Sequence, residues 1–355
     1  MRITMKQLKL CLLFFCLYTF PAAAQQGTIV NETLSSIVLK ENRIGLDPSR
    51  KVKVYLPPGY SSSGRSYPVV YYCHTFFSNP DKLFQDTKLP ALLDRAFASG
   101  IVKEFILVAA DYSSPTLGSL FENSPTTGRW LDFTANELVT FIDQKFRTIP
   151  NRNSRAITGD FFGGRGAIAL AMTHAELFSV VYAMHPVATG MGYIPWATLS
   201  INWQEIYQAK QFSDIKSTGF TPIFLAINQA FLPNANRPPF YCDYFYEMEN
   251  GTPKLNVPNT QKLKAAFLLD HMLEKYADNL RILRGFAFDW GRYDGNQDHV
   301  YSAVNFSRVL EDFGIEHEAE EYRGNPWSVN WTEYGRFNTR VLPFLARYLV
   351  FEAEK

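Results

Sequence analysis

The residues around position 161 have the spacing of a nucleophile elbow without its nucleophile. Gly159, Phe161 and Gly163 take the first, middle and last places of a G-x-S-x-G pattern, between an apolar run at 155–158 and small residues from Gly164 onward. Such a turn exposes a hydroxyl between a strand and a helix that approach closely, which requires small neighbours. Phe161 carries no nucleophilic or acid-base atom, so we expect that no acyl-enzyme forms there.

Short apolar runs alternate with amphipathic segments along the chain, which predicts the elements that position this turn. The runs are rich in β-branched and aromatic residues, as buried strands are, and lie at 51–56, 69–73, 105–110, 155–158, 180–184, 221–227 and 283–288. Apolar residues at helical spacing predict helices at 89–99, 134–146, 164–173, 262–277 and 301–313. The alternation predicts an α/β fold with a mostly parallel sheet and helices on both faces.

Two segments break the alternation. Residues 188–219 and 231–255 are rich in Pro, Asn, Tyr and Trp, and we expect them to form cap-like insertions over the carboxyl edge of the sheet. Ligands bind at that edge in folds of this class.

The order of several segments resembles the esterase D / feruloyl-esterase type of esterase, within the α/β-hydrolase superfamily, over essentially all of the chain after residue 24. These segments are 52–60 with 67–74, 118–133 before a helix at 137–143, the turn at 155–171, 289–294 and 314–327. The resemblance implies an α/β-hydrolase fold in one domain, 25–355. It also implies that Asp294 stands at the position of the triad acid.

Two other positions depart from the family pattern. Asn325 and Pro326 stand where the resemblance puts the catalytic histidine, and Phe161 stands at the nucleophile. The two losses agree, because a histidine base has no purpose without a hydroxyl to deprotonate. His74 ends the strand beside the family's oxyanion hole, and Thr75 replaces the glycine that follows it there.

Aromatic residues are expected near the mouth of the former active site. With His74, Thr75 and Asp160, the candidate pocket residues are Phe76, Phe162 and Trp327. Aromatic rings either fill such a pocket or stack on a sugar ring or an aromatic acyl group. The first hypothesis is therefore a non-hydrolytic member of an esterase family that binds a carbohydrate or acylated ligand or serves as an interaction scaffold.

A rearranged hydrolase is the alternative hypothesis. His299, five residues after Asp294, is the best substitute base, working with Asp160 or Asp294 on water. Asp160 lies one residue before the nucleophile position, and Asp294 also fits a leftover acid or a cap of the glycine-rich turn around it. Asp160, Asp294 and His299 could form a metal site, but no HExxH or paired-histidine spacing supports one, so no cofactor or metal is expected.

Composition predicts that the protein is globular, and the N-terminus predicts where it is exported. With 46% hydrophobic residues in 355, 35 basic against 34 acidic residues and no basic block, a globular chain without a nucleic-acid partner is expected. A basic start, an apolar run and an A-x-A site before Gln25 predict a signal peptide at 1–24, and hence a periplasmic or extracellular protein without a membrane span in its mature form. Cys73 and Cys242 then remain, as buried free thiols.

Overall fold

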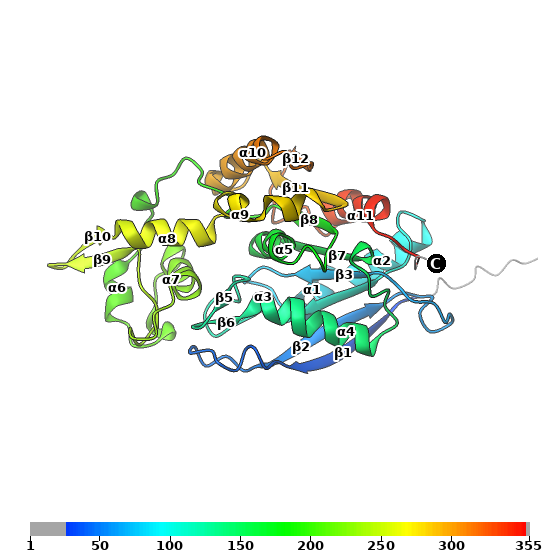
Figure 1. The fold of residues 1–355 in the computed structure, drawn as a ribbon, viewed down its shortest axis with the longest axis horizontal. Helices are drawn as coiled ribbons and strands as arrows, with labels where there is room; N and C mark the ends of the chain where they lie inside the picture. Colours follow the sequence, from blue (N-terminus) through cyan, green and yellow to red (C-terminus); the bar gives the residue numbers. More distant parts are fainter. Residues whose placement is uncertain (1–25, 353–355) are drawn as a thin grey trace, which may run out of the picture.

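A computed structural model describes residues 26–352 of the chain. The signal peptide expected at 1–24, with its cleavage site, lies outside the described residues. The architecture is an eight-stranded sheet covered by helices, with a lobe of further helices beside it (Figure 1). Among residues 26–352, no helix combines the length and the apolar character that a membrane crossing needs.

The sheet has the strand order β1-β2-β4-β3-β7-β8-β11-β12. Strands β1 and β2 and strands β2 and β4 pair antiparallel, and every later pair is parallel. The strands are β1 (Thr28–Ser35), β2 (Ser49–Leu56), β3 (Val69–Cys73), β4 (Ile106–Ala110), β7 (Arg155–Asp160), β8 (Val180–Met184), β11 (Gly285–Gly291) and β12 (Glu318–Tyr322). This mostly parallel sheet confirms the α/β fold expected from the sequence.

Alternate residues of the central strands enter two separate cores. In β3, Val69, Tyr71 and Cys73 pack on one face of the sheet. Val70 and Tyr72 pack on the other face, as the two-residue period of a strand requires. Both faces are buried, which explains why these strands read as unbroken apolar runs.

Different helices cover the two faces. The first face packs against α3 (Trp130–Asp132) with the π-helical turn Phe133–Leu138, α4 (Val139–Lys145), α5 (Phe162–Thr173), α9 (Leu269–Arg281) and α10 (Gln297–Asp312). The second packs against α1 (Pro80–Asp86), α2 (Leu89–Ala98) and α11 (Leu342–Tyr348), the last preceded by a π-helical turn at Phe337–Val341. Short strands β5 (Asn123–Ser124) and β6 (Gly128–Arg129) form a separate hairpin.

The lobe has a hydrophobic core of its own, at the left in Figure 1. It contains α6 (Trp203–Gln208), α7 (Phe220–Phe231), α8 (Val257–Phe267) and the hairpin of β9 (Tyr246–Glu249) with β10 (Thr252–Leu255). Single 3-10 turns at Trp196–Thr198 and Phe212–Asp214 join these helices, and another at Arg152–Ser154 precedes β7. The two segments expected as cap-like insertions, 188–219 and 231–255, both belong to this region.

Two expectations about elements are wrong. The apolar run 221–227 is not a strand but part of helix α7, which is buried along most of its length; a helix that is apolar on every side has no period that separates it from a buried strand. The single helix expected at 262–277 is two, α8 and α9, because Leu268 has an extended backbone between them (φ −86°, ψ 129°).

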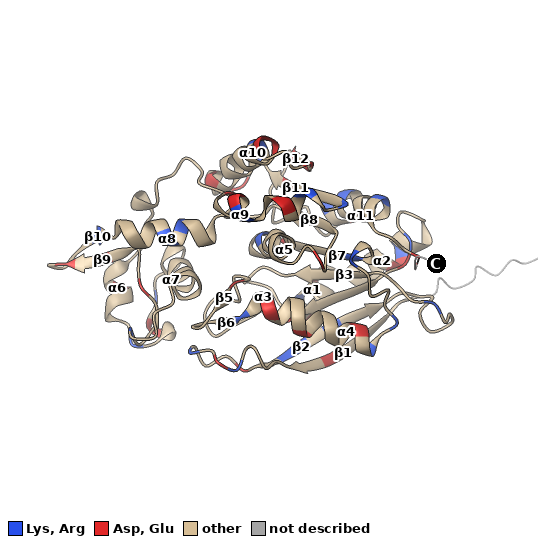
Figure 2. Ribbon diagram, viewed as in Figure 1, with Lys and Arg blue, Asp and Glu red and all other residues tan. Residues whose placement is uncertain are grey.

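The two cysteines of the described chain, Cys73 and Cys242, are both free and buried, as expected. Positions of lysine and arginine alternate with positions of aspartate and glutamate along the described ribbon (Figure 2).

Candidate functional site

The turn between β7 and α5 has the sharp backbone of a nucleophile elbow. Phe161 lies at this turn with φ 50° and ψ −116°, a conformation that non-glycine residues rarely adopt. A Cβ on Gly163 would stand 1.9 Å from the carbonyl oxygen of Cys73, and one on Gly159 would stand 2.5 Å from the same oxygen. The glycines are therefore required because β3, β7 and α5 meet here with no room for a side chain.

The ring of Phe161 is held between two other rings. It stacks on Trp327 with centroids 3.5 Å apart and planes 14° apart, and it lies 4.9 Å from the ring of His185. Phe161 is 3% exposed. Its strained backbone is the kind that persists only when surrounding packing fixes it, and the two rings provide that packing.

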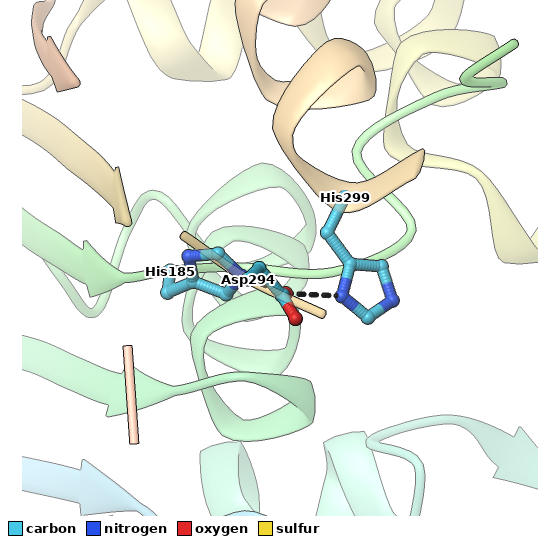
Figure 3. Close-up of side chains that lie close together, drawn as sticks. All are labelled: His185, Asp294 and His299. Atoms are coloured by element: carbon cyan, nitrogen blue, oxygen red, sulfur yellow. Dashed lines mark hydrogen bonds and ion pairs between the residues drawn. The ribbon is translucent and has the colours of Figure 1, made fainter. Parts of the chain in front are cut away.

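Asp294 lies between two histidines, drawn in Figure 3. Its Oδ2 accepts from His185 Nε2 at 2.7 Å and from His299 Nδ1 at 2.8 Å. Its Oδ1 accepts from the backbone N–H of Asn296 at 2.9 Å. Burial opposes ionisation of this carboxyl, but the hydrogen bonds from His185 and His299 outweigh burial and hold its pKa well below its usual range.

The hydrogen bonds fix the proton positions on both rings. The backbone N–H of Gly291 donates to His185 Nδ1 at 2.9 Å, so the ring proton of neutral His185 is on Nε2 and points at Asp294. Burial lowers the pKa of His185, which favours this neutral form. His299 donates from Nδ1, and its Nε2 is 2.9 Å from Asn296 Nδ2, from which it accepts.

The positions of these ring protons also decide whether the cluster can bind a metal. His185, Asp294 and His299 bring three ligand-type atoms within 4.8 Å of one another. A metal needs a lone pair on each nitrogen, but the Nε2 of His185 carries the proton because its Nδ1 already accepts from Gly291. The cluster is therefore better described as an ordered hydrogen-bond network than as a metal centre.

The loop expected to replace the catalytic histidine contributes a different residue. Asn325 Oδ1 accepts from the backbone N–H of Trp327 at 2.9 Å. Pro326 lies against Gly291, where a Cβ would approach its Cδ to 2.9 Å. Neither Asn325 nor Pro326 lines the cavity above the elbow, whereas Trp327 does.

Asp160 lies apart from His299 and does not line the cavity. Its Oδ1 accepts from the hydroxyl of Tyr72 at 2.8 Å, and Tyr72 contacts Trp331 on the second face of the sheet. Burial raises the pKa of Asp160 to about 6, against the hydrogen bond from Tyr72. The structure thus brings together Asp294 and His299 but does not bring Asp160 to them.

Both ring nitrogens of His74 are engaged in hydrogen bonds with the backbone. Its Nδ1 donates to the carbonyl of Thr75 at 2.8 Å and its Nε2 accepts from the backbone N–H of Tyr112 at 2.9 Å. Burial lowers its pKa, in keeping with a neutral ring. His74 does not line the cavity, although the next two residues, Thr75 and Phe76, do.

A cavity of about 180 Å³ lies above the elbow, between the sheet edge and the lobe. Its lining is predominantly aromatic and aliphatic, with Thr75, Asn296, Asp298, His299 and Ser302 as its polar side chains. The aromatic residues are Phe76, Phe77, Phe161, Phe162, Trp196, Phe220, Phe224, Phe267 and Trp327. This volume is on the order of one six-membered ring with a short substituent.

Sequence reasoning missed two parts of this site. His185 directly follows β8, but its contact with Asp294 spans 109 positions of the chain and was not predicted. The lobe residues Trp196, Phe220 and Phe224 were not expected to face Phe161, because their distance from it depends on how the lobe folds back.

Comparisons with known proteins agree with this architecture. Residues 45–218 match the family described as Putative esterase. Esterase Rv1288 of Mycobacterium tuberculosis is 31% identical over 142 residues, which are 38% of this chain and 28% of that protein. The endo-1,4-beta-xylanase/feruloyl esterase of Xylanibacter ruminicola is 28% identical over 134 residues, 35% of this chain and 18% of that protein. The alignments thus span less than a third of these curated relatives.

Solved structures resemble the chain over nearly its full length. A ferulic acid esterase superimposes with a TM-score of 0.63 at 20% identity, covering 91% of this chain and 99% of the other. An S-formylglutathione hydrolase from Agrobacterium tumefaciens gives a TM-score of 0.55 at 13% identity, covering 92% and 98%. At such identities the likeness establishes the fold. Together, the comparisons show an α/β-hydrolase fold in which residues 45–218 are similar to the Putative esterase family.

Proposed function

We propose that this protein binds a small acylated or aryl ligand in the cavity above Phe161 and does not hydrolyse esters by a serine mechanism. The observation that carries the proposal is Phe161 itself. It has the strained backbone of an elbow residue, and its ring is stacked on Trp327 at 3.5 Å where a nucleophile would need to be open to a substrate. No atom of this side chain attacks a carbonyl.

The lining supports an acylated ligand over a carbohydrate, the other class expected from the sequence. Sugar hydroxyls need a partner for each buried donor and acceptor, and the polar side chains of the cavity gather near the start of α10, apart from Thr75. The carbonyl oxygen of an acyl group, in contrast, needs only a hydrogen-bond donor or a partial positive charge. The N-terminus of α5 begins at Phe162 without an acidic residue in its first turn, and a helix N-terminus attracts partial negative charge.

The test is a paired measurement on the chain from Gln25 onward. Hydrolysis of p-nitrophenyl acetate is compared with buffer, and binding of ethyl ferulate is followed by quenching of tryptophan fluorescence, since Trp196 and Trp327 line the cavity. We expect the buffer rate together with saturable quenching, weakened in Phe224→Asp. Absence of saturable binding would refute the proposal.

A second candidate function is hydrolysis by water with His299 as general base. Asp294 orients His299 through a 2.8 Å hydrogen bond, and His299 lines the cavity; this pairing favours Asp294 over Asp160 as the partner carboxylate. Against it, the amide of Asn296 already occupies Nε2 of His299. Ester turnover by the wild type that is lost in His299→Ala, but kept in the distant control His174→Ala, would establish this function instead.

The expected export signal supports placing the binding activity in the periplasm or outside the cell. N-terminal sequencing of the mature protein from a secreting host would give Gln25 as its first residue if the signal is cleaved as expected.

A further inference from the structure

One wall of the cavity carries negative charge without a matching cation. Asp298 lines the cavity, and within residues 26–352 no lysine or arginine does. The Oδ1 of Asp298 accepts from the backbone N–H of Ile194 at 2.8 Å. No lysine or arginine of the described chain forms an ion pair with Asp298.

Two further carboxylates lie behind this wall. Asp294 is paired only with histidines, of which His185 is neutral, so its negative charge is not cancelled by a fixed cation. The carboxylate of Asp270 lies against Gly190, which lines the cavity, at 2.5 Å from where a Cβ would stand. One acidic side chain therefore lies in the lining and two lie behind it, and burial raises the pKa of one of these two, Asp270.

Most of the remaining lining is aromatic. An aromatic ring presents a negative face that attracts a cation within about 6 Å of its centre. Phe77 and Trp327 line the cavity and are also 57% and 56% exposed, so their rings reach its mouth. One face of Trp327 stacks on Phe161, so a ligand meets this ring only at its edge or at its other face.

Four groups near the cavity carry positive charge and act in the opposite direction. Arg165 and Lys264 lie 5.4 Å from the ring of Phe267 and 5.5 Å from the ring of Trp196, but neither lines the cavity. The N-termini of α5 and α10 each contribute about half a positive charge. Asp298 in the first turn of α10 offsets that of α10, whereas α5 has no acidic residue in its first turn. Among the described residues, Asp298 is the only acidic, lysine or arginine side chain in the lining, so it acts on a ligand at shorter range than Arg165 and Lys264 do.

We infer that the cavity prefers a ligand that carries a positively charged amine or quaternary ammonium group on an apolar aryl or acyl body. The inference rests on the proposed function, because it names the charge of the ligand that the same cavity would bind. The ammonium group would stand beside Asp298, with the apolar body among the phenylalanine rings.

The test uses three probes of nearly equal shape, phenylpropylamine, phenylpropanol and phenylpropanoate, titrated into the chain from Gln25 onward by calorimetry at neutral pH. We expect the amine to bind about tenfold more tightly than the alcohol, from the ring and carboxylate attraction together. The carboxylate probe should bind most weakly of the three.

Asp298→Asn keeps an oxygen for the Ile194 N–H and removes the charge. We expect the amine-to-alcohol ratio of affinities to fall several-fold in this variant and to stay at its wild-type value in Asp278→Asn, a control at an exposed carboxylate. Equal binding of all three probes would overturn the inference and leave the proposed function standing. Binding of none of them would also overturn the inference, and the proposed function would then be decided by the ethyl ferulate measurement.

Discussion

At the scale of the residue, the site is defined by a side chain that fits its backbone poorly. Phe161 keeps a positive φ of 50° at the elbow, which costs on the order of 1 to 3 kcal/mol. Stacking on Trp327 and contact with His185 offset that cost. The spacing of Gly159, Phe161 and Gly163 was enough to predict this turn. The partners of Phe161 were not all predictable, because His185 lies beside it only once strands β7 and β8 pair in the sheet.

Phe161→Ser gives the first residue-scale prediction. We expect the variant to hydrolyse p-nitrophenyl acetate no faster than wild type, because a serine there needs a base and Nε2 of His299 is occupied by Asn296. Loss of the buried ring should lower the free energy of unfolding by about 3 kcal/mol.

Phe161→Ala is the matched control, since it removes the same ring without adding a hydroxyl. Esterase activity in Phe161→Ser, with none in Phe161→Ala, would mean that a base does reach the hydroxyl.

At the scale of the element, a buried arginine joins the lobe to helix α5. Arg165 in α5 is 0% exposed. Its guanidinium donates to the carbonyls of Phe267 and Ala266, at the end of α8, and to that of Leu120. Burial lowers the pKa of Arg165 to about 10, so it is still charged at neutral pH.

Arg165→Met is expected to lower the free energy of unfolding by about 3 kcal/mol, because three carbonyl oxygens lose their donor. Arg165→Lys should recover only part of the loss, since one ammonium group does not match the planar fork that spans three carbonyls. Urea denaturation measures both variants. Arg347→Met, at an exposed ion pair, is the control and should change stability by less than about 0.5 kcal/mol; an equally small change in Arg165→Met would contradict this account.

Elements of the sheet were more predictable than those of the lobe. The apolar runs at 69–73 and 180–184 have the same first and last residues as strands β3 and β8. They are apolar throughout because both sides of the sheet are buried. The run at 221–227 lies in helix α7, where burial on every side erases the period. Strand β12 was not expected at all, since this edge strand contains three glutamates and only its last residue, Tyr322, is fully buried.

At the scale of the whole molecule, two faces of the sheet respond to pH in opposite directions. On the face of the cavity, the pKa of His185 and the pKa of Asp294 both lie below their ordinary values. The unfolded chain therefore binds protons there that the native protein does not, and this contribution to stability is lost as the pH falls. Near the other face, burial raises the pKa of Asp160 to about 6.

The native protein thus holds a proton on Asp160 in a range where the unfolded chain has released it. That stabilising contribution is complete below the unfolded pKa of about 4 and is lost as the pH rises through about 6. Asp160→Asn keeps an oxygen for the Tyr72 hydroxyl and has no proton to lose. We therefore expect its stability relative to wild type to rise by about 2 kcal/mol between pH 4 and pH 7, measured by urea denaturation across that range.

The difference between the two proteins isolates Asp160, because the acid sensitivity of Asp294 and His185 is common to both and cancels. Asp278→Asn, at an exposed ion pair, should show a far smaller change with pH. A pH-independent difference between Asp160→Asn and wild type would show that Asp160 is ionised throughout. It would then stand beside Tyr72 as a charged group, and the elbow would carry a fixed negative charge on the side of the sheet opposite Phe161.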